Sequence, residues 1–182
     1  MTEEEFSQLK RQATGGTYTV YQKMLQQKDS SIAYTKKYAP LWIYASVKRA
    51  KKSIHALVPL EHLCVYSKLI PQLMNPDIDT KLLIEKWPEN MQDIMTVSML
   101  MHAGRAKICR SDEKLPAYVS IDSHNFLVQR DPEYYWLCAN NFKIAKKLTD
   151  VILEKWQKPT HISTHIQFNP FDYKTDRQNS DA

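Results

Sequence analysis

Glycine is scarce in this sequence, and the scarcity limits both the folds and the binding loops that the chain can form. The 182 residues contain three glycines, two of them adjacent at Gly15 and Gly16. No glycine-rich phosphate-binding loop of the GxGxxG or GxxxxGK[ST] type can therefore be written anywhere in the chain. The sequence favours long helices joined by turns of proline, asparagine and aspartate.

The hydrophobic periodicity changes along the chain and predicts alternating helices and strands. Helical spacing predicts helices over residues 2–14, from about Thr17, and over 39–53, 60–74 with a break at Pro71, 88–104 and 140–158. Buried or alternating runs predict strands over 53–59, 79–85, 105–111 and 134–139, and a hairpin over 117–130 that turns near Asp122 and Ser123. Residues 29–38 are interpreted as a linker.

This order of elements predicts an α/β fold with a layered, mostly parallel or mixed sheet covered by helices. The first three strands are joined by helical crossovers, so we expect them to be parallel with right-handed connections. The expected organisation is a helical extension over residues 1–38, an α/β domain over 39–158, and a partly disordered tail over 159–182.

Composition indicates a globular protein that acts in the cytoplasm, without a membrane partner. Hydrophobic residues make up 43% and charged residues 25% of the chain. No apolar run is long enough to span a membrane, and the charged N-terminus does not resemble a signal peptide. These features predict a cytoplasmic protein.

The cysteines and histidines do not form a metal-binding pattern. Cys64, Cys109 and Cys138 lie far apart in the sequence, which favours buried reduced thiols over a disulfide or a zinc site. His161 and His165 have a spacing suited to metal binding on a helix, but the residues around them favour an extended chain. We therefore expect no metal and no cofactor.

The whole chain has a net charge of +5, and many of its basic residues gather within one short segment. Two interpretations remain open: a phosphate-binding region for nucleic acid, or the solvated face of an ordinary helix. The candidate nucleic-acid contacts are Lys36, Lys37, Lys48, Arg49, Lys51 and Lys52.

Two further groups have a structural and a functional interpretation. Four methionines in the helix over 88–104 are expected to form its packed face, with a plastic ligand-binding surface as the alternative. In the last strand, Tyr134 and Trp136 share one face and Tyr135 takes the other. Packing is favoured for these aromatics, and stacking on a ligand is the alternative.

Three stretches resemble, in the same order, parts of the phospholipase D-like domain. They are AKKSIHALVPLEHL, YVSIDSHNFLV and YYWLCANNFKIAKKLTDVILEKWQ. The resemblance is closest to the regulatory domain of TrmB-type transcriptional regulators and spans about Ala39 to Lys158. It implies a phospholipase D-like fold and a role in transcription regulation. Those regulators carry a winged helix-turn-helix, for which the residues before Ala39 are too few.

The resemblance also implies where catalytic residues would lie. Active members use a histidine nucleophile on phosphorus, lysine and asparagine to stabilise phosphate oxygens, and two paired domains. When the turns are aligned, the motif aspartate is Asp122, but Leu115 and Ala117 occupy the histidine and lysine positions. The downstream Ser-x-Asn then falls on residues 138–140, where only Asn140 matches.

A second register pairs His124 with Asp131 and places Phe126 at the lysine position. Both registers lack part of the catalytic set, so the resemblance implies a degenerate site without catalysis. His124 is kept as the alternative catalytic candidate.

These observations lead to one main prediction and two alternatives. The main prediction is a non-catalytic regulatory or scaffold protein that forms a homodimer or binds a protein partner or small effector. Its ligand pocket would contain Asp122, His124, Cys138 and Asn140, near the strand ends at Pro59 and Glu85. The alternatives are nucleic-acid binding through the basic region, and a divergent phosphodiesterase or nuclease that uses His124.

Overall fold

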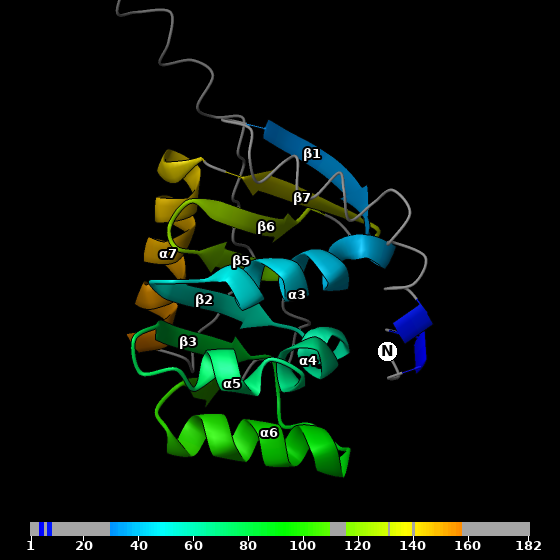
Figure 1. Cartoon of the computed structure of the whole chain (residues 1–182), viewed down its shortest axis with the longest axis vertical. Helices are drawn as coiled ribbons and strands as arrows, with labels where there is room; N and C mark the ends of the chain where they lie inside the picture. The colour runs from blue at the N-terminus through cyan, green and yellow to red at the C-terminus, as the bar shows by residue number, and fades with distance from the viewer. Residues whose placement is uncertain are drawn as a thin grey trace, which may run out of the picture.

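One seven-stranded sheet organises the protein, and the predicted α/β class is confirmed (Figure 1). The structure is a computed structural model that describes residues 4–5, 7–8, 30–109, 116–130, 132–139 and 141–157. The strands are β1 (Ser30–Thr35), β2 (Ser53–Val58), β3 (Asp79–Ile84), β4 (Ala106–Ile108), β5 (Tyr118–Ile121), β6 (Asn125–Gln129) and β7 (Tyr134–Ala139). Their order across the sheet is β1-β7-β6-β5-β2-β3-β4.

The helices lie in the connections that the sequence predicted. They are α3 (Ala39–Arg49), α4 (Leu60–Ser67), α5 (Ile70–Leu73), α6 (Met91–His102) and α7 (Phe142–Gln157), with a short 3-10 helix at Lys36–Tyr38. The chain breaks between α4 and α5 just before Pro71, as expected. β2, β3 and β4 pair in parallel, and the other strand pairs are antiparallel.

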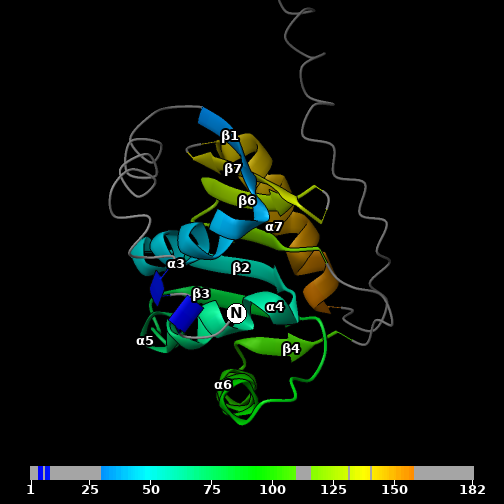
Figure 2. The same ribbon diagram turned by 90° about the vertical axis from the view of Figure 1, so that its right-hand side faces the viewer.

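Helices cover both faces of the sheet (Figure 2), and each face has its own hydrophobic core. One core joins the sheet to α3, α4 and α6, and its largest fully buried side chains are Trp42, Tyr66 and Tyr135. The other lies under α7, where Ala145, Leu148 and Ile152 pack on the sheet. The result is a three-layer α/β/α arrangement among the described elements. No described helix is long and apolar enough to cross a bilayer.

The hairpin between β5 and β6 turns at Asp122 and Ser123, as predicted. Both residues have positive φ angles, 54° and 56°, and the His124 N–H donates to the Ile121 carbonyl at 3.0 Å. Two consecutive residues in the left-handed backbone conformation identify a type I′ turn, whose twist matches that of the flanking strands. Aspartate tolerates this conformation better than most residues, which explains its place there.

Residues 30–35 form an edge strand, so the prediction of a linker over residues 29–38 is wrong for them. β1 pairs antiparallel with β7 over its whole length, from Ser30 opposite Ala139 to Thr35 opposite Tyr134. The Lys36 N–H extends this contact by donating to the Glu133 carbonyl at 2.8 Å. Short polar runs carry little periodicity, and the strand exists because the outer edge of β7 offers unpaired backbone groups.

The methionines of α6 are exposed, so the prediction that they form its packed face is wrong. Thr96, Val97 and Leu100 are buried beneath the helix. The four methionines project outward with exposed fractions of 38–71%: Met91, Met95, Met99 and Met101. The Asn90 side chain caps the helix by accepting the Asp93 N–H at 2.9 Å. Gly104, with a φ of 69°, follows its carboxyl end.

Several predictions fall on residues that the structure does not describe. They concern the helix from about Thr17, the tail over 159–182 with His161 and His165, and the motif positions Leu115, Asp131 and Asn140. Residues 4, 5, 7 and 8 are helical, in agreement with the first predicted helix.

Burial raises the pKa of the Cys109 thiol to about 12 and also raises that of Cys64, which keeps both thiols protonated at neutral pH.

Candidate nucleic-acid interface

The Asp122 carboxylate holds the loop that joins α3 to β2. Its Oδ1 accepts the backbone N–H groups of Lys52 at 2.7 Å and Ser53 at 2.9 Å, and its Oδ2 accepts that of Lys51 at 3.0 Å. The Asp122 N–H donates to the Ser53 carbonyl at 2.9 Å. Because a carboxylate forms strong hydrogen bonds with several N–H donors, the hairpin turn and the loop form one unit. The side chains of Lys51 and Lys52 project from this unit and are exposed.

A chain of contacts links the same turn to the amino end of α7. The His124 ring Nδ1 lies 2.5 Å from the Asp122 carbonyl oxygen, and the Asn141 N–H donates to the His124 carbonyl at 2.9 Å. The His124 and Phe142 ring centroids are 5.6 Å apart, and the Lys146 Nζ lies 6.0 Å from the Phe142 ring. Two basic segments that are far apart in the sequence therefore meet at this hairpin turn.

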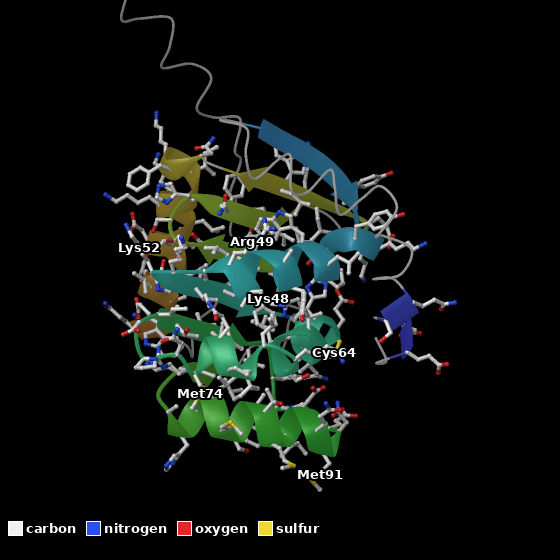
Figure 3. All side chains as sticks on the ribbon, viewed as in Figure 1. Lys48, Arg49, Lys52, Cys64, Met74 and Met91 are labelled. Atoms are coloured by element: carbon white, nitrogen blue, oxygen red, sulfur yellow. The ribbon has the colours of Figure 1, made fainter. Side chains whose placement is uncertain are left out.

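We define the basic end surface as the group of exposed residues around this turn. Its members are Lys48, Arg49, Lys51, Lys52, His124, Phe142, Lys143 and Lys146. Figure 3 shows Lys48, Arg49 and Lys52 along the end of α3 and the loop into β2. The amino end of α7 adds the partial positive charge of a helix terminus. The surface has the chemistry of a phosphate-binding site with one aromatic ring, since Phe142 is 53% exposed.

Sequence reasoning found only part of this surface. Lys143, Lys146 and Phe142 belong to the run NNFKIAKK, which was interpreted only as an amphipathic helix. About ninety residues separate them from Lys51 and Lys52, and only the sheet brings the two groups together. The available signal was the cluster of lysines beside an exposed phenylalanine in the first two turns of that helix.

Lys36 and Lys37 do not join the basic end surface, so the predicted basic region is divided. They precede α3, whereas Lys48 and Arg49 end it, and an 11-residue helix rises about 16 Å. The Lys36 Nζ instead pairs with the Glu61 carboxylate at 2.9 Å. The six residues therefore form two separate groups, and their contact with nucleic acid stays a prediction.

The carboxylate of Asp79, the first residue of β3, is already paired. The Asp79 carboxylate contacts the Lys81 Nζ at 2.5 Å and the buried His55 Nε2 at 2.9 Å. Partial burial acts to raise the pKa of Asp79, but the hydrogen bonds from Lys81 and His55 outweigh it and leave the pKa lowered. Asp79 is therefore ionised at neutral pH, and its charge is balanced locally by Lys81.

Protonation of His55 is expected to destabilise the fold at mildly acidic pH. Burial lowers the pKa of His55 below 6.5 and outweighs the opposing effect of Asp79. A group with a lowered pKa in the folded state stabilises the protein above its unfolded pKa, and this contribution is lost as the pH falls. The free energy of unfolding should therefore decrease as the pH falls below about 6.5. Urea titrations between pH 7.5 and 5 measure this, and the slope should flatten in His55→Gln. An equal slope in both proteins would assign the effect to other groups.

The predicted pocket is divided between the two ends of the sheet. Asp122 pairs with the start of β2, while Pro59 and Glu85 follow the carboxyl ends of β2 and β3. The length of a six-residue strand, about 16 Å, separates these positions. The prediction that Pro59 and Glu85 lie beside Asp122 is therefore wrong.

The carboxyl ends of these strands carry a separate polar group. The Glu85 carboxylate accepts the Leu60 N–H at 3.0 Å, at the start of α4. The buried His62 Nε2 lies 3.4 Å from the Tyr135 hydroxyl. Burial, with the nearby Glu61 carboxylate, raises the pKa of Tyr135 and keeps the phenol protonated. These residues had no signal in the sequence, because α4 was interpreted only as a helix.

The structure also separates the aligned catalytic positions. Ala117 lies opposite the end of β6, where its N–H donates to the Gln129 side chain at 2.9 Å. Cys138 pairs with Phe126, three residues further along the hairpin, or about 10 Å. In the second register, Phe126 at the lysine position is buried in the core under α7. Neither register assembles a phosphate-activating set among the described residues.

Comparisons with known proteins identify the fold through solved structures. No protein-family model and no curated protein matches the sequence. The archaeal chromatin protein TrmBL2, whose structure is described as showing a novel mode of DNA binding, matches with a TM-score of 0.59 and 12% identity. The match covers 87% of this chain but 64% of TrmBL2, so the chain spans less than two thirds of that protein.

Two phospholipase D-type structures match as well. Nuc from Salmonella typhimurium, a phospholipase D family member, has a TM-score of 0.50 and 13% identity over 72% of this chain and 94% of Nuc. NucT from Helicobacter pylori has a TM-score of 0.51 and 8% identity over 74% of this chain and all of NucT. At these identities the likeness concerns the fold. The chain therefore has a phospholipase D-like fold that resembles TrmB-type proteins.

Proposed function

We propose that this chain is a non-catalytic regulatory protein that binds nucleic acid through the basic end surface. The observation that carries the proposal is that two exposed basic segments, at the carboxyl end of α3 and the amino end of α7, flank the Asp122 turn. Their cations are Lys48, Arg49, Lys51, Lys52, Lys143 and Lys146. Exposed cations from two segments, fixed by one carboxylate and one helix terminus, are suited to a row of phosphates. The similarity in fold to TrmBL2, whose structure shows DNA binding, also supports the proposal of nucleic-acid binding.

Nucleic-acid binding at this surface should not depend on the base sequence of the nucleic acid. Lysine side chains act as point charges on phosphate oxygens, and phosphate contacts position a protein without reading bases. The Phe142 ring beside His124 can stack on an exposed base, which single strands offer and duplexes cover. We therefore propose that the surface binds both single-stranded and double-stranded nucleic acid, and that Phe142 adds affinity for single strands.

The absence of catalysis is part of the proposal. Ala117 has no group that can act on phosphorus, and Phe126 replaces a lysine in the other register with a buried ring. The Nδ1 atom of His124 contacts the backbone carbonyl of Asp122 and not a carboxylate. These features support a regulatory domain over a phosphodiesterase. We further propose that the domain is dimeric and binds a protein partner or small effector.

Salt dependence tests the proposed function directly. A labelled duplex of arbitrary sequence and a single strand of equal length are titrated with the full chain, with anisotropy as the readout. If all six cations meet phosphates, duplex affinity should fall roughly 10³-fold between 50 and 200 mM salt. Affinity that is unchanged over this range, or no binding at low salt, would overturn the proposal.

The same mixtures test the catalytic alternative. Intact nucleic acid after prolonged incubation supports the non-catalytic proposal. Cleavage that disappears in His124→Ala would establish the divergent nuclease instead. Cleavage that survives this substitution points to a contaminating enzyme, and repurification then decides whether the chain itself is inactive.

A further inference from the structure

The outer face of α6 is apolar over three turns. Met91, Met95 and Met99 recur every fourth residue, with exposed fractions of 71%, 62% and 46%. Trp87, 47% exposed, lies four residues before Met91 and outside the helix. Residues four apart lie on one side of a helix, so the three methionines form one stripe. Surface helices normally present charged residues on this side, which makes the stripe an interaction surface.

No charged side chain interrupts this stripe. From Met91 to His102 the helix contains a single carboxylate, Asp93, which is buried and bonded to Asn90. The other exposed residues of the helix are the neutral Gln92, Ser98 and Met101, and His102 at its last position. Depletion of charge together with an excess of methionine is typical of the core of a protein–protein interface. A like copy of the helix would therefore meet no charge repulsion along the stripe.

The stripe is also self-complementary. Met91 and Met99 lie four residues to either side of Met95, so an antiparallel copy places Met91 opposite Met99 and Met95 opposite itself. The ends differ in charge: exposed Glu89 precedes the helix, and exposed His102 lies at its other end, near the half-buried Arg105, whose guanidinium donates to the Ile78 carbonyl. Antiparallel pairing brings Glu89 of one copy towards the basic end of the other and opposes the two helix dipoles.

We propose that two copies of this chain associate through an antiparallel pair of α6 helices, with Met95 at the twofold axis. The proposal rests on the dimeric state included in the proposed function and names its interface; it does not depend on nucleic-acid binding. Figure 1 places α6 at the end of the molecule away from β1 and β7, with its outer side uncovered by any described element. A dimer formed there leaves the basic end surface of each copy accessible.

The size of the stripe predicts a reversible dimer. The three methionines of the stripe, with Met101 at its margin and Trp87 just before the helix, offer an apolar area on the order of 500 Å², which is at the upper end for a monomer. A standard stable interface covers about 800 Å² per partner, so the helix pair alone gives a weak association. Flexible methionines adapt to one another in such a contact at little steric cost.

Sedimentation equilibrium of the full chain tests the proposal at about 1–100 µM, where an interface of this size should associate. The unchanged chain should shift from monomer to dimer across this range. Met95→Lys should remain monomeric, because two ammonium groups would face each other at the axis. Tyr134→Lys, at a residue 53% exposed in β7, is the matched control and should dimerise like the unchanged chain.

Cysteine cross-linking tests the symmetry. Under mild oxidation, Met95→Cys should form a covalent dimer, whereas Met101→Cys, on the margin of the stripe, should do so much less. The unchanged chain reports any background from its own cysteines. A dimer that persists in Met95→Lys overturns this interface while the proposed dimeric state stands. A monomer at every concentration overturns both, and the salt titration still decides nucleic-acid binding separately.

Discussion

Replacing Asp122 with alanine is expected to lower the free energy of unfolding by about 2–4 kcal/mol, a large fraction of the stability of a small domain. The carboxylate accepts the N–H groups of Lys51, Lys52 and Ser53, and hydrogen bonds to a charged group are stronger than neutral ones. Alanine also tolerates the φ of 54° poorly. Urea unfolding followed by tryptophan fluorescence measures the loss, since the chain has four tryptophans.

Two further substitutions separate the conformational effect from the hydrogen bonds. Asp122→Gly removes the carboxylate but accepts a positive φ without strain, so it should be nearly as destabilising as Asp122→Ala. Asp122→Asn also tolerates the turn and retains one acceptor oxygen, so it should fall between alanine and the unchanged chain. If Asp122→Gly were as stable as the unchanged chain, the carboxylate would contribute nothing and the turn conformation alone would matter.

The double substitution Lys51→Glu with Lys52→Glu is expected to weaken nucleic-acid binding at least tenfold at about 0.1 M salt. Two cations at the centre of the basic end surface become carboxylates, and their backbone N–H groups keep the bonds to Asp122. The slope of log affinity against log salt should also fall by roughly 2 on duplex DNA. Anisotropy titrations at several salt concentrations give both numbers.

The matched control is Lys37→Glu with Lys86→Glu. Both lysines are exposed, and they lie near the opposite end of β2 and β3. Either double variant changes the net charge by −4, from +5 to +1, so only the position of the charge differs. The control should bind almost as tightly as the unchanged chain. An equal loss in both variants would mean that net charge, and not the basic end surface, attracts nucleic acid.

Most of the fold was accessible from the sequence because its signals are local. The runs at residues 53–59 and 79–85 contain the continuous apolar stretches 56–58 and 82–84, as expected for buried parallel strands, and the Asp122–Ser123 turn has residues suited to a hairpin. β1 and the outward methionines were missed for a common reason. The first depends on the edge of β7 that β1 joins, and the second on the outer side of α6, which none of the described elements covers.

The candidate site was less accessible because it depends on the sheet register. Lys51, His124 and Phe142 meet only because β5 runs antiparallel to β2 and α7 starts beside the hairpin. The resemblance correctly drew attention to Asp122. It could not show that Asp122 binds the loop after α3, or that Glu85 belongs to the other end of the sheet. Spacing in the sequence does not contain this information.

The pairing of β1 with β7 bears on how the protein completes folding during its synthesis. Ser30 lies opposite Ala139, so the edge strand is made early and its partner appears more than a hundred residues later. At about 5–20 residues per second, the ribosome needs roughly 5–20 s to supply β7 after β1. Until then residues 30–35 have no strand to join. Closing this long loop should come late in folding, after the parallel strands and the hairpin have formed the centre of the sheet.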